Sequence, residues 1–368
     1  MYPLVNPPEQ PLSISVKDVA AAASVSVGTV SNVLNRPDRV AAATVARVHE
    51  AIDRLGYVRN DAARQLRAGR SRSIGLIVLD SANPFFAEVA RGAEERAARE
   101  GMAVLVGNSD QSLERESAYL DLFREQRVGG VLLTPTDVTA SALRRVIDGG
   151  IPLVLVDGKL PGGGVPSVAV DDVEGGMLAV QHLLDRGRRR IAFVGGPLTI
   201  RQVADRLEGA RRALAQTPGA QLEVIELDAL TVLQGRDAGE AIARRPPGER
   251  PDAVFCANDL LAVGVLQGTA ILGHVRVPED IALIGYDDID FAQAAVVPLT
   301  SIRQPARAIG EAAVDLLLEA LADGASTAEA SAVSRQARFR PELVARASTG
   351  GSGPARGHGS SASPERVK

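Results

Sequence analysis

The sequence predicts an all-α head with a helix-turn-helix geometry, followed by an α/β core of two lobes, each built on a doubly wound parallel sheet. Three short helical segments fall within about 45 residues near the N-terminus, with a tight break between the first two. From Ser73 onward, continuous Val/Ile/Leu runs alternate with helical stretches in two successive series, which is typical of parallel sheets covered on both faces. The predicted segments are a head at 13–58, a hinge helix and linker at 59–72, the core at 73–347 and a disordered tail at 348–368.

The composition is that of a globular protein that stays in solution. Of the 368 residues, 45% are hydrophobic and 23% charged, and no apolar run approaches the roughly 20 residues that a bilayer span requires. The N-terminal stretch has neither a basic nor an apolar signal region, and the single cysteine, Cys256, cannot form an internal disulfide. These features predict a cytoplasmic protein with no membrane partner and no metal site.

The charge is distributed unevenly along the chain. Residues 1–70 carry nine basic and six acidic side chains, a net charge of +3, whereas the whole chain has a net charge of −4. The remainder therefore has a net charge of −7. A basic head on an acidic body favours a nucleic-acid partner for the head, although a solvated surface with an accidental charge bias is the alternative at this point.

Each predicted helix of the head has recognisable end signals. Ser15 is placed to cap a helix beginning VKDVAAAA, with Asp18 as the partner residue of a capping box. Ser26 is placed to cap a second helix, VGTVSNVLN, and Gly56 is placed to end a third helix that runs from about Ala42 to Leu55. A short helix, DAARQLR, which Asn60 is placed to cap, is too short to be stable alone and is interpreted as a hinge.

The core is expected to bind a ligand between its lobes. The chain is predicted to pass from one lobe to the other near 171–176 and again near 298–304. In open α/β sheets, ligands bind where the carboxyl ends of the strands face a crevice. Polar side chains follow several predicted strands at these ends: Asp80, Asn83, Asp157, Arg201, Gln202, Asn258 and Asp287.

The motifs resemble those of the lac repressor family of transcription factors. The resemblance begins with VKDVAAAASVSVGTVSNVLNRPDRV, continues with NPFF at 83–86 and AND at 257–259, and ends with VPEDIALIGYDD and PLTSIRQPARAIGEAAVDLLL. It spans residues from about 13 to 346 in the family's order, and implies a core like that of periplasmic binding proteins. Three positions depart from the family: Ser24 replaces a turn glycine, Arg59 replaces a proline, and Gly158 stands where arginine is common.

The helix-turn-helix geometry assigns the second helix to the major groove of DNA. Asn32 can pair with an adenine edge, Val27 can contact a thymine methyl group, and Thr29 can reach phosphate or base, whereas Gly28 offers no side chain. The alternative is that Thr29 and Asn32 only solvate an exposed helix. By resemblance, Leu66 is a minor-groove wedge and its arginine neighbours contact phosphates, although Leu66 could instead pack on the core. The predicted DNA-binding residues are Val27, Gly28, Thr29, Ser31, Asn32, Asn35, Arg39, Arg64, Leu66 and Arg67.

The predicted effector is a sugar or a purine-like molecule. Carboxylates, amides and an arginine around an aromatic ring suit a polyhydroxylated or purine-like ligand. The predicted ligand-binding residues are Asn83, Phe85, Asp157, Arg201, Asn258 and Asp287, of which Arg201, Asn258 and Asp287 follow the resemblance. Asp80 and Asp157 have an alternative interpretation as strand-end caps.

Taken together, these features predict a homodimeric transcriptional regulator that binds a pseudo-palindromic double-stranded DNA operator and uses no cofactor. Repression is the family's usual mode, and the sequence leaves open whether the effector releases or promotes DNA binding. A secreted binding protein would share the two-lobed core, but the predicted head argues against it. An enzyme is disfavoured because neither G-x-G-x-x-G after a strand nor G-x-x-x-x-G-K-[ST] occurs, and the four histidines lie in unrelated contexts.

Overall fold

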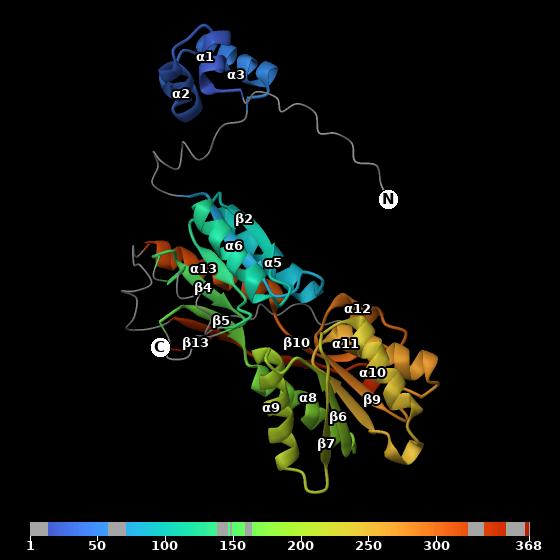
Figure 1. Cartoon of the computed structure of the whole chain (residues 1–368). Coiled ribbons are helices and arrows are strands. Elements are labelled where there is room, and N and C mark those ends of the chain that lie inside the picture. Colours follow the sequence, from blue (N-terminus) through green and yellow to red (C-terminus); the bar gives the residue numbers. More distant parts are fainter. Residues whose placement is uncertain are drawn as a thin grey trace. The chain divides into compact units, whose positions relative to one another are not determined.

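The computed structural model describes residues 14–57, 71–137, 146–147, 149–158, 164–322, 335–350 and 365–367. The chain forms two compact units, Met1–Arg70 and Ser71–Lys368, which are described separately below (Figure 1). The predicted hinge helix, with Arg64, Leu66 and Arg67, lies outside the described residues. No helix in the described part of the chain is both long and apolar enough to cross a membrane.

The first unit contains the three predicted helices, α1 (Val16–Ala22), α2 (Val27–Asn35) and α3 (Ala42–Leu55). The predicted end signals are confirmed. The backbone N–H and the hydroxyl of Ser15 both donate to the Asp18 carboxylate, at 2.8 and 2.7 Å, and Gly56 ends α3 in the left-handed conformation. Because one side of each helix is apolar, the three pack around a small core of Val19, Ala20, Ala23, Val30, Val33, Val48 and Ala51.

The turn between α1 and α2 places residue 24 in a backbone conformation that glycine adopts most easily. Ser24 has a φ of +53°, in the left-handed region that non-glycine residues seldom adopt. The Val25 N–H still bonds to the Ala20 carbonyl at 3.0 Å, so the turn is closed despite the serine. Ser24, which departs from the expected glycine, therefore costs conformational free energy that glycine would not cost at this position.

Lobe 1 of the second unit is a sheet of seven strands with helices on both faces (Figure 1). All neighbouring strands are parallel except β11 and β13, and the order across the sheet is β13-β11-β5-β4-β3-β1-β2. Helices α5 (Pro84–Arg99) and α13 (Ala306–Ala322) pack against each other, and α6 (Leu113–Glu125) packs on β1 and β2. The strands are β1 (Ser73–Val78), β2 (Ala103–Asn108), β3 (Val131–Leu133), β4 (Leu153–Val156), β5 (Ser167–Val170), β11 (Gln336–Phe339) and β13 (Glu365–Val367).

Lobe 2 is a sheet of six strands in the order β12-β10-β9-β8-β6-β7, parallel except for the pair β10–β12. Its helices are α8 (Asp172–Asp185), α9 (Arg201–Ala215), α10 (Val232–Arg244), α11 (Asp259–Leu266) and α12 (Asp290–Ala294). Its strands are β6 (Arg190–Gly195), β7 (Gln221–Glu226), β8 (Ala253–Cys256), β9 (Ala282–Asp287), β10 (Thr300–Arg303) and β12 (Glu342–Val344). The predicted fold class of two doubly wound, mostly parallel sheets is confirmed.

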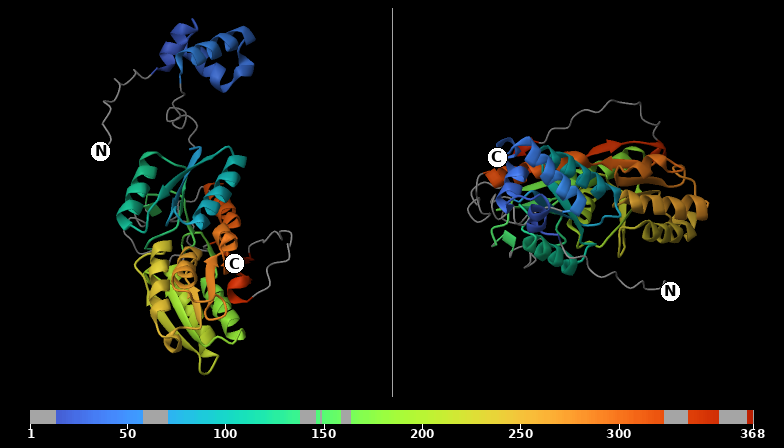
Figure 2. Two further views of the ribbon diagram at one scale, coloured as in Figure 1. Left: turned by 90° about the vertical axis from the view of Figure 1, so that its right-hand side faces the viewer. Right: turned by 90° about the horizontal axis from the view of Figure 1, so that it is seen from above.

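Within the described residues the chain crosses between the lobes after β5, after β10 and after β11, and a fourth passage joins β12 of lobe 2 to β13 of lobe 1. The first two crossings were predicted, and the later ones were not. Segments far apart in the sequence therefore lie side by side. Helix α13, coloured orange, sits beside the cyan α5 of lobe 1 in both views (Figure 2). The two lobes are thus held together by several short stretches of chain.

The predicted start of the tail at Ser348 is wrong. Ser348 and Thr349 are buried in lobe 2, where Ser348 donates from Oγ to the Leu283 carbonyl and the two threonine hydroxyls of Thr300 and Thr349 bond at 2.7 Å. Residues 365–367 also form a strand. Small hydroxyl residues resembled a linker in the sequence, but here they satisfy buried backbone groups at the end of the sheet.

Candidate DNA interface and effector cleft

Helix α2 presents one polar face and buries the other. Val30 and Val33 are buried against α1 and α3, whereas Val27, Gly28, Asn32 and Asn35 are exposed on the opposite side. Because the helical repeat is 3.6 residues, positions 27, 28, 31, 32 and 35 share one face. Five of the predicted residues are therefore brought together on the accessible side of α2, whereas the half-buried Thr29 lies outside this face, and Arg39 is exposed just beyond the end of the helix.

Two of the predicted DNA-binding side chains are also held within the helix. The hydroxyls of Thr29 and Ser26 bond at 2.9 Å, and Ser26 caps the helix by accepting from the Thr29 N–H at 3.0 Å. Asn35 donates from Nδ2 to the Ser31 carbonyl at 2.8 Å. These contacts fix side-chain orientation on the exposed face before any partner binds, which lowers the entropy lost on binding.

Two side-chain bridges join the lobes at the carboxyl ends of their strands. Asn83, the cap of α5 in lobe 1, donates from Nδ2 to Oδ2 of Asp287 at 3.0 Å. Gln202 on α9 of lobe 2 donates from Nε2 to the carbonyl and to Oδ2 of Asp157, at 2.6 and 3.1 Å. The four residues are all buried. Three of the predicted cleft residues, Asn83, Asp157 and Asp287, are therefore placed at the contact between the lobes.

Arg206 lies at the centre of the buried charges of this region. Its Nε donates to Asp172 at 2.8 Å, its Nη1 donates to the Ala257 carbonyl at 2.7 Å, and its guanidinium group stacks 3.7 Å from the centre of the Tyr286 ring. Helices α8 and α9 approach closely enough for this because Gly176 has no side chain, and a Cβ there would collide with the Arg206 backbone.

Both bridging carboxylates sit in strained backbone at strand ends. Asp157 follows β4 with a φ of +55°, and Asp287 ends β9 with a φ of +106°. Such conformations in non-glycine residues cluster at functional sites, where surrounding structure maintains them. Burial raises the pKa of both carboxyl groups. For Asp157 the nearby Asp172 adds to this effect, and its pKa rises to about 7.

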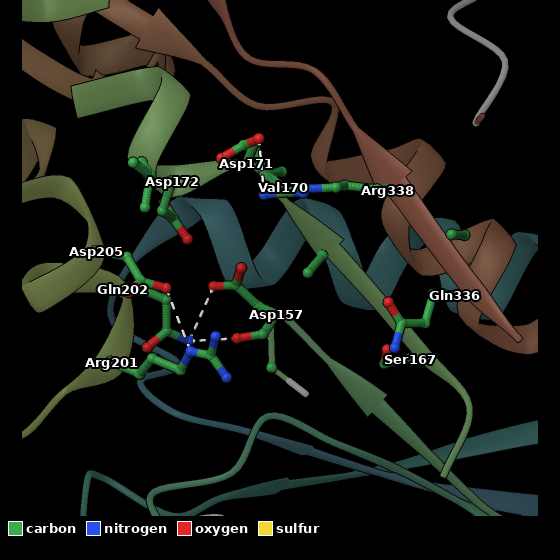
Figure 3. A pocket seen from close by; sticks show the side chains of 14 residues that line it. Asp157, Ser167, Val170, Asp171, Asp172, Arg201, Gln202, Asp205, Gln336 and Arg338 are labelled. Carbon is green, nitrogen blue, oxygen red and sulfur yellow. Dashed lines mark hydrogen bonds and ion pairs between the residues drawn. The ribbon is translucent and has the colours of Figure 1, made fainter. Parts of the chain in front are cut away.

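Two cavities adjoin Asp157, Gly158, Arg201 and Gln202. The larger, the cleft cavity, has a volume of about 480 Å³ and lies between lobe 1 loops and the start of α9. The smaller, the hinge cavity, has a volume of about 180 Å³ and lies beside the first crossing between the lobes (Figure 3). The cleft cavity is lined by Gln111, Leu113, Pro135, Thr136, Asp137, Asp157, Gly158, Thr199, Arg201 and Gln202.

The remaining predicted ligand residues occupy other positions. Phe85 is buried edge-on against Phe86, with ring centres 5.1 Å apart, and lines neither cavity. Asn258 is the buried cap of α11 and accepts from the Leu261 N–H at 2.9 Å. Arg201 lines both cavities and pairs with Asp205 at 3.2 Å. The carboxylate of Asp80 accepts from the Ala82 N–H at 2.8 Å, which matches its interpretation as a strand-end cap.

Arg206, Asp172 and Gln304 were missed by the sequence reasoning. Gln304 donates to Oδ1 of Asp287 at 2.7 Å from the second crossing. Arg206 had a usable signal, because it falls in the apolar stripe of α9 between Val203, Leu207 and Ala210, where a charged side chain must be buried. No group of three or more His, Cys, Asp or Glu side chains in the described part of the chain could hold a metal ion.

Comparisons with known proteins agree with this architecture. Residues 15–60 match the family of bacterial regulatory proteins of the lacI family, and residues 180–349 match the periplasmic binding protein-like domain. The HTH-type transcriptional repressor PurR of Vibrio atlanticus is 35% identical over 316 residues, covering 84% of this chain and 92% of that protein. PurR of Vibrio vulnificus is 35% identical and covers 90% of this chain and 97% of that protein.

Solved structures give the same result. The lac repressor dimer bound to operator and the anti-inducer ONPF is 28% identical, with a TM-score of 0.75, and the alignment covers 92% of this chain and 99% of that one. The transcriptional regulator CelR in complex with cellobiose is 30% identical, with a TM-score of 0.67, and the alignment covers 91% of this chain and 99% of that one.

A helix-turn-helix unit joined to a two-lobed binding core defines the class of ligand-responsive, DNA-binding transcriptional regulators, which are not enzymes. Within that class, this chain belongs to the lacI family of bacterial regulators.

Proposed function

We propose that this chain is a homodimeric repressor that binds a pseudo-palindromic operator through α2 and responds to a sugar bound in the cleft cavity. The exposed face of α2, with Val27 and Asn32 accessible above a fully packed core, is the observation that supports base reading most directly. Arg64, Leu66 and Arg67 remain predicted contacts of the segment that follows. A repressor acts on chromosomal DNA, so the expected location is the cytoplasm.

The chemistry of the cleft cavity favours a sugar over a purine. Its lining offers carboxylate, amide, hydroxyl and guanidinium groups, and none of its described residues is aromatic. A polyhydroxylated ligand can satisfy such groups through many hydrogen bonds, whereas a purine gains much of its binding from stacking on aromatic rings. CelR and a LacI-family regulator from Enterococcus faecium were solved with cellobiose and ribose respectively, which also supports a sugar. The purine alternative is supported by the name of the PurR relatives.

We expect the bridges between the lobes to couple ligand binding in the cleft cavity to operator binding. A ligand in the cleft cavity touches Asp157 and Gln202, the two residues of one bridge, so a ligand that binds the joined and the separated lobes with different affinity changes the free energy of lobe closure. In a dimer, a change in lobe angle alters the separation of the two heads. Such a coupling typically amounts to about 1–3 kcal/mol and acts in both directions.

An exposed apolar edge of lobe 1 suits the dimer contact. Strand β2 is the last strand of its sheet, and it exposes Leu105 and Val106, while Leu122 on the adjoining α6 is also exposed. Unpaired apolar strand edges are normally covered. We expect Val106→Asp to shift the protein toward monomer in sedimentation velocity, while Arg212→Asp on the exposed side of α9 leaves the dimer intact.

The deciding experiment is fluorescence anisotropy on a labelled operator, with and without a panel of sugars and purines. Specific operator binding at nanomolar to micromolar protein, reversed or enhanced by one sugar, is the expected result. Binding that is equal for operator and random DNA would overturn the assignment of α2, and a response only to purines would overturn the sugar.

A further inference from the structure

The hinge cavity is lined by both lobes and differs from the cleft cavity in most of its residues. Strands β5 and β11 of lobe 1 form one side, and the starts of α8 and α9 in lobe 2 form the other. Its lining residues are Asp157, Gly158, Ser167, Ala169, Val170, Asp171, Asp172, Val173, Arg201, Gln202, Asp205, Gln336, Ala337 and Arg338. A molecule bound there would touch the segment between β5 and α8, where the chain first crosses between the lobes. It would also touch β11, after which the chain crosses again.

Four carboxylates and two guanidinium groups line this cavity, and the guanidinium groups are already paired. Arg201 lies 3.2 Å from Asp205, and Arg338 lies 2.7 Å from Asp171. Asp172 is paired at 2.8 Å with Arg206, which is buried and is not among the lining residues. Asp157 is the remaining acid, and the only side-chain donor to it among the described residues is the neutral amide of Gln202.

The second carboxylate oxygen of Asp157 has no donor. Oδ1 is buried and has no hydrogen-bond partner among the described residues, and the Asp157 residue as a whole is 5% exposed. Figure 3 shows this oxygen turned away from Gln202 and toward the Asp171–Asp172 turn, so that the carboxylates of Asp157 and Asp172 face each other across the cavity. A buried acceptor without a donor costs free energy, and two facing carboxylates repel.

We propose that the hinge cavity is a second small-molecule site, separate from the cleft cavity, and that it takes a small organic ammonium compound whose charged nitrogen binds to Asp157 Oδ1. An ammonium group supplies three donors and a positive charge, so it satisfies the orphan oxygen and offsets the repulsion between Asp157 and Asp172. An anion is excluded by the excess of carboxylates. Burial and, after it, the nearby Asp172 carboxylate raise the pKa of Asp157, and a bound ammonium group would oppose both effects.

The position of the site gives the bound ammonium compound a regulatory role. It would bind to Asp157 of lobe 1 next to Gln202 and Asp172 of lobe 2, and would therefore stabilise the joined arrangement of the lobes. The same arrangement is the one that the Asn83–Asp287 bridge maintains. The ammonium compound would thus change the affinity for the cleft ligand without occupying the cleft.

The test compares two probes that differ only in charge, 4-aminobutan-1-ol and butane-1,4-diol, by isothermal titration calorimetry on the full chain at pH 8 and constant ionic strength. We expect the amine to bind about tenfold more tightly than the diol or better, since a charge-assisted bond to a buried carboxylate replaces a neutral one. Equal affinities for the amine and the diol, or no binding of the amine, would overturn the proposal without any variant.

Three variants locate the amine. Asp157→Asn removes the charge but keeps an acceptor for Gln202, and it should reduce amine binding to the level of the diol. Because Asp157 lines both cavities, Ala169→Leu, which narrows the hinge cavity alone, should also weaken amine binding, and unchanged binding in this variant would refute the hinge site. Asp137→Asn removes a carboxylate that lines the cleft cavity alone, and amine binding should stay within about twofold of wild type. Loss of binding in Asp137→Asn with retention in Asp157→Asn would assign the amine to the cleft and refute the hinge site. Operator binding is measured separately, so failure of the repressor function would be recognised independently.

Discussion

The Nδ2 group of Asn83 in lobe 1 donates a 3.0 Å hydrogen bond to the carboxylate of Asp287 in lobe 2. The same carboxylate accepts from Gln304 at the second crossing, and Arg206 lies 4.0 Å from it. Asp287 thus joins both lobes and a crossing segment through one buried group. Any change in lobe angle must rearrange these contacts.

Asp287→Ala is expected to abolish the response of operator binding to the effector while leaving ligand-free operator affinity nearly unchanged. The substitution removes the acceptor that joins the lobes, but it lies in the second unit and leaves the exposed face of α2 intact. Operator anisotropy with and without effector measures both quantities. A full effector response in Asp287→Ala would mean that this bridge takes no part in sensing.

Asn83→Ser separates the bridge from the helix cap. Serine caps helices as well as asparagine does, but its shorter side chain removes the amide donor that reaches Asp287. Because a buried carboxylate loses a donor, we expect the free energy of unfolding to fall by about 1–3 kcal/mol in urea titrations. A variant as stable as wild type would show that the bond contributes no net stability.

Asn32→Ala is expected to relax operator preference at one base pair in each half-site, at a cost of about 1–3 kcal/mol, because a bidentate base contact is lost. Arg39→Ala provides the contrast. Loss of a phosphate contact should weaken binding to all sequences alike and reduce the salt slope by about one. A selection of bound sequences from a random pool distinguishes the two, and an unchanged preference in Asn32→Ala would contradict the placement of α2 in the major groove.

Ser24→Gly is expected to stabilise the head by about 0.5–1 kcal/mol, since glycine adopts a φ of +53° without the strain of a Cβ and loses only part of this gain in the unfolded chain. Ser24→Ala keeps the Cβ and should give no gain. Amide hydrogen exchange of α1 and α2 in the full chain measures the difference. Slower exchange in both variants would point to the serine hydroxyl instead of the backbone.

The raised pKa of Asp157 makes stability depend on pH in a defined direction. In the unfolded chain this carboxyl group titrates near 3.8, and in the folded chain near 7, so the folded state binds more protons between these values. Stability should therefore fall as pH rises from about 4 to 7. The charged groups around it are Asp172, Arg206 and Asp287. Urea titrations across this window measure the free energy of unfolding of wild type and of Asp157→Asn. The two values should be similar at low pH and differ at high pH, where the variant should be the more stable. A difference that does not change with pH would contradict the raised pKa.

Long apolar strands and capped helices could be predicted from the sequence because their signals are local. Strands β10, β11 and β12 could not, because TSIR, QARF and ELV are short, mixed in polarity and positioned by pairing with distant strands. The cleft was predicted from strand ends, which located Asp157 and Asp287. Phe85 and Asn258 satisfied the same rule, yet one packs inside lobe 1 and the other caps a helix, and only tertiary structure distinguishes these roles.

The crossings between the lobes also govern the order in which the protein can fold during synthesis. Strand β11, which pairs with β5, lies after all but the last strand of lobe 2 in the sequence. Until the ribosome has made it, the β5 edge of lobe 1 has no neighbour on that side, and β10 likewise waits for β12. Both lobes therefore become complete only after β11 and β12 have been made, and they do so almost together. During synthesis the nascent chain therefore exposes strand edges that can pair with other chains. We expect chaperones that cover such edges to bind it.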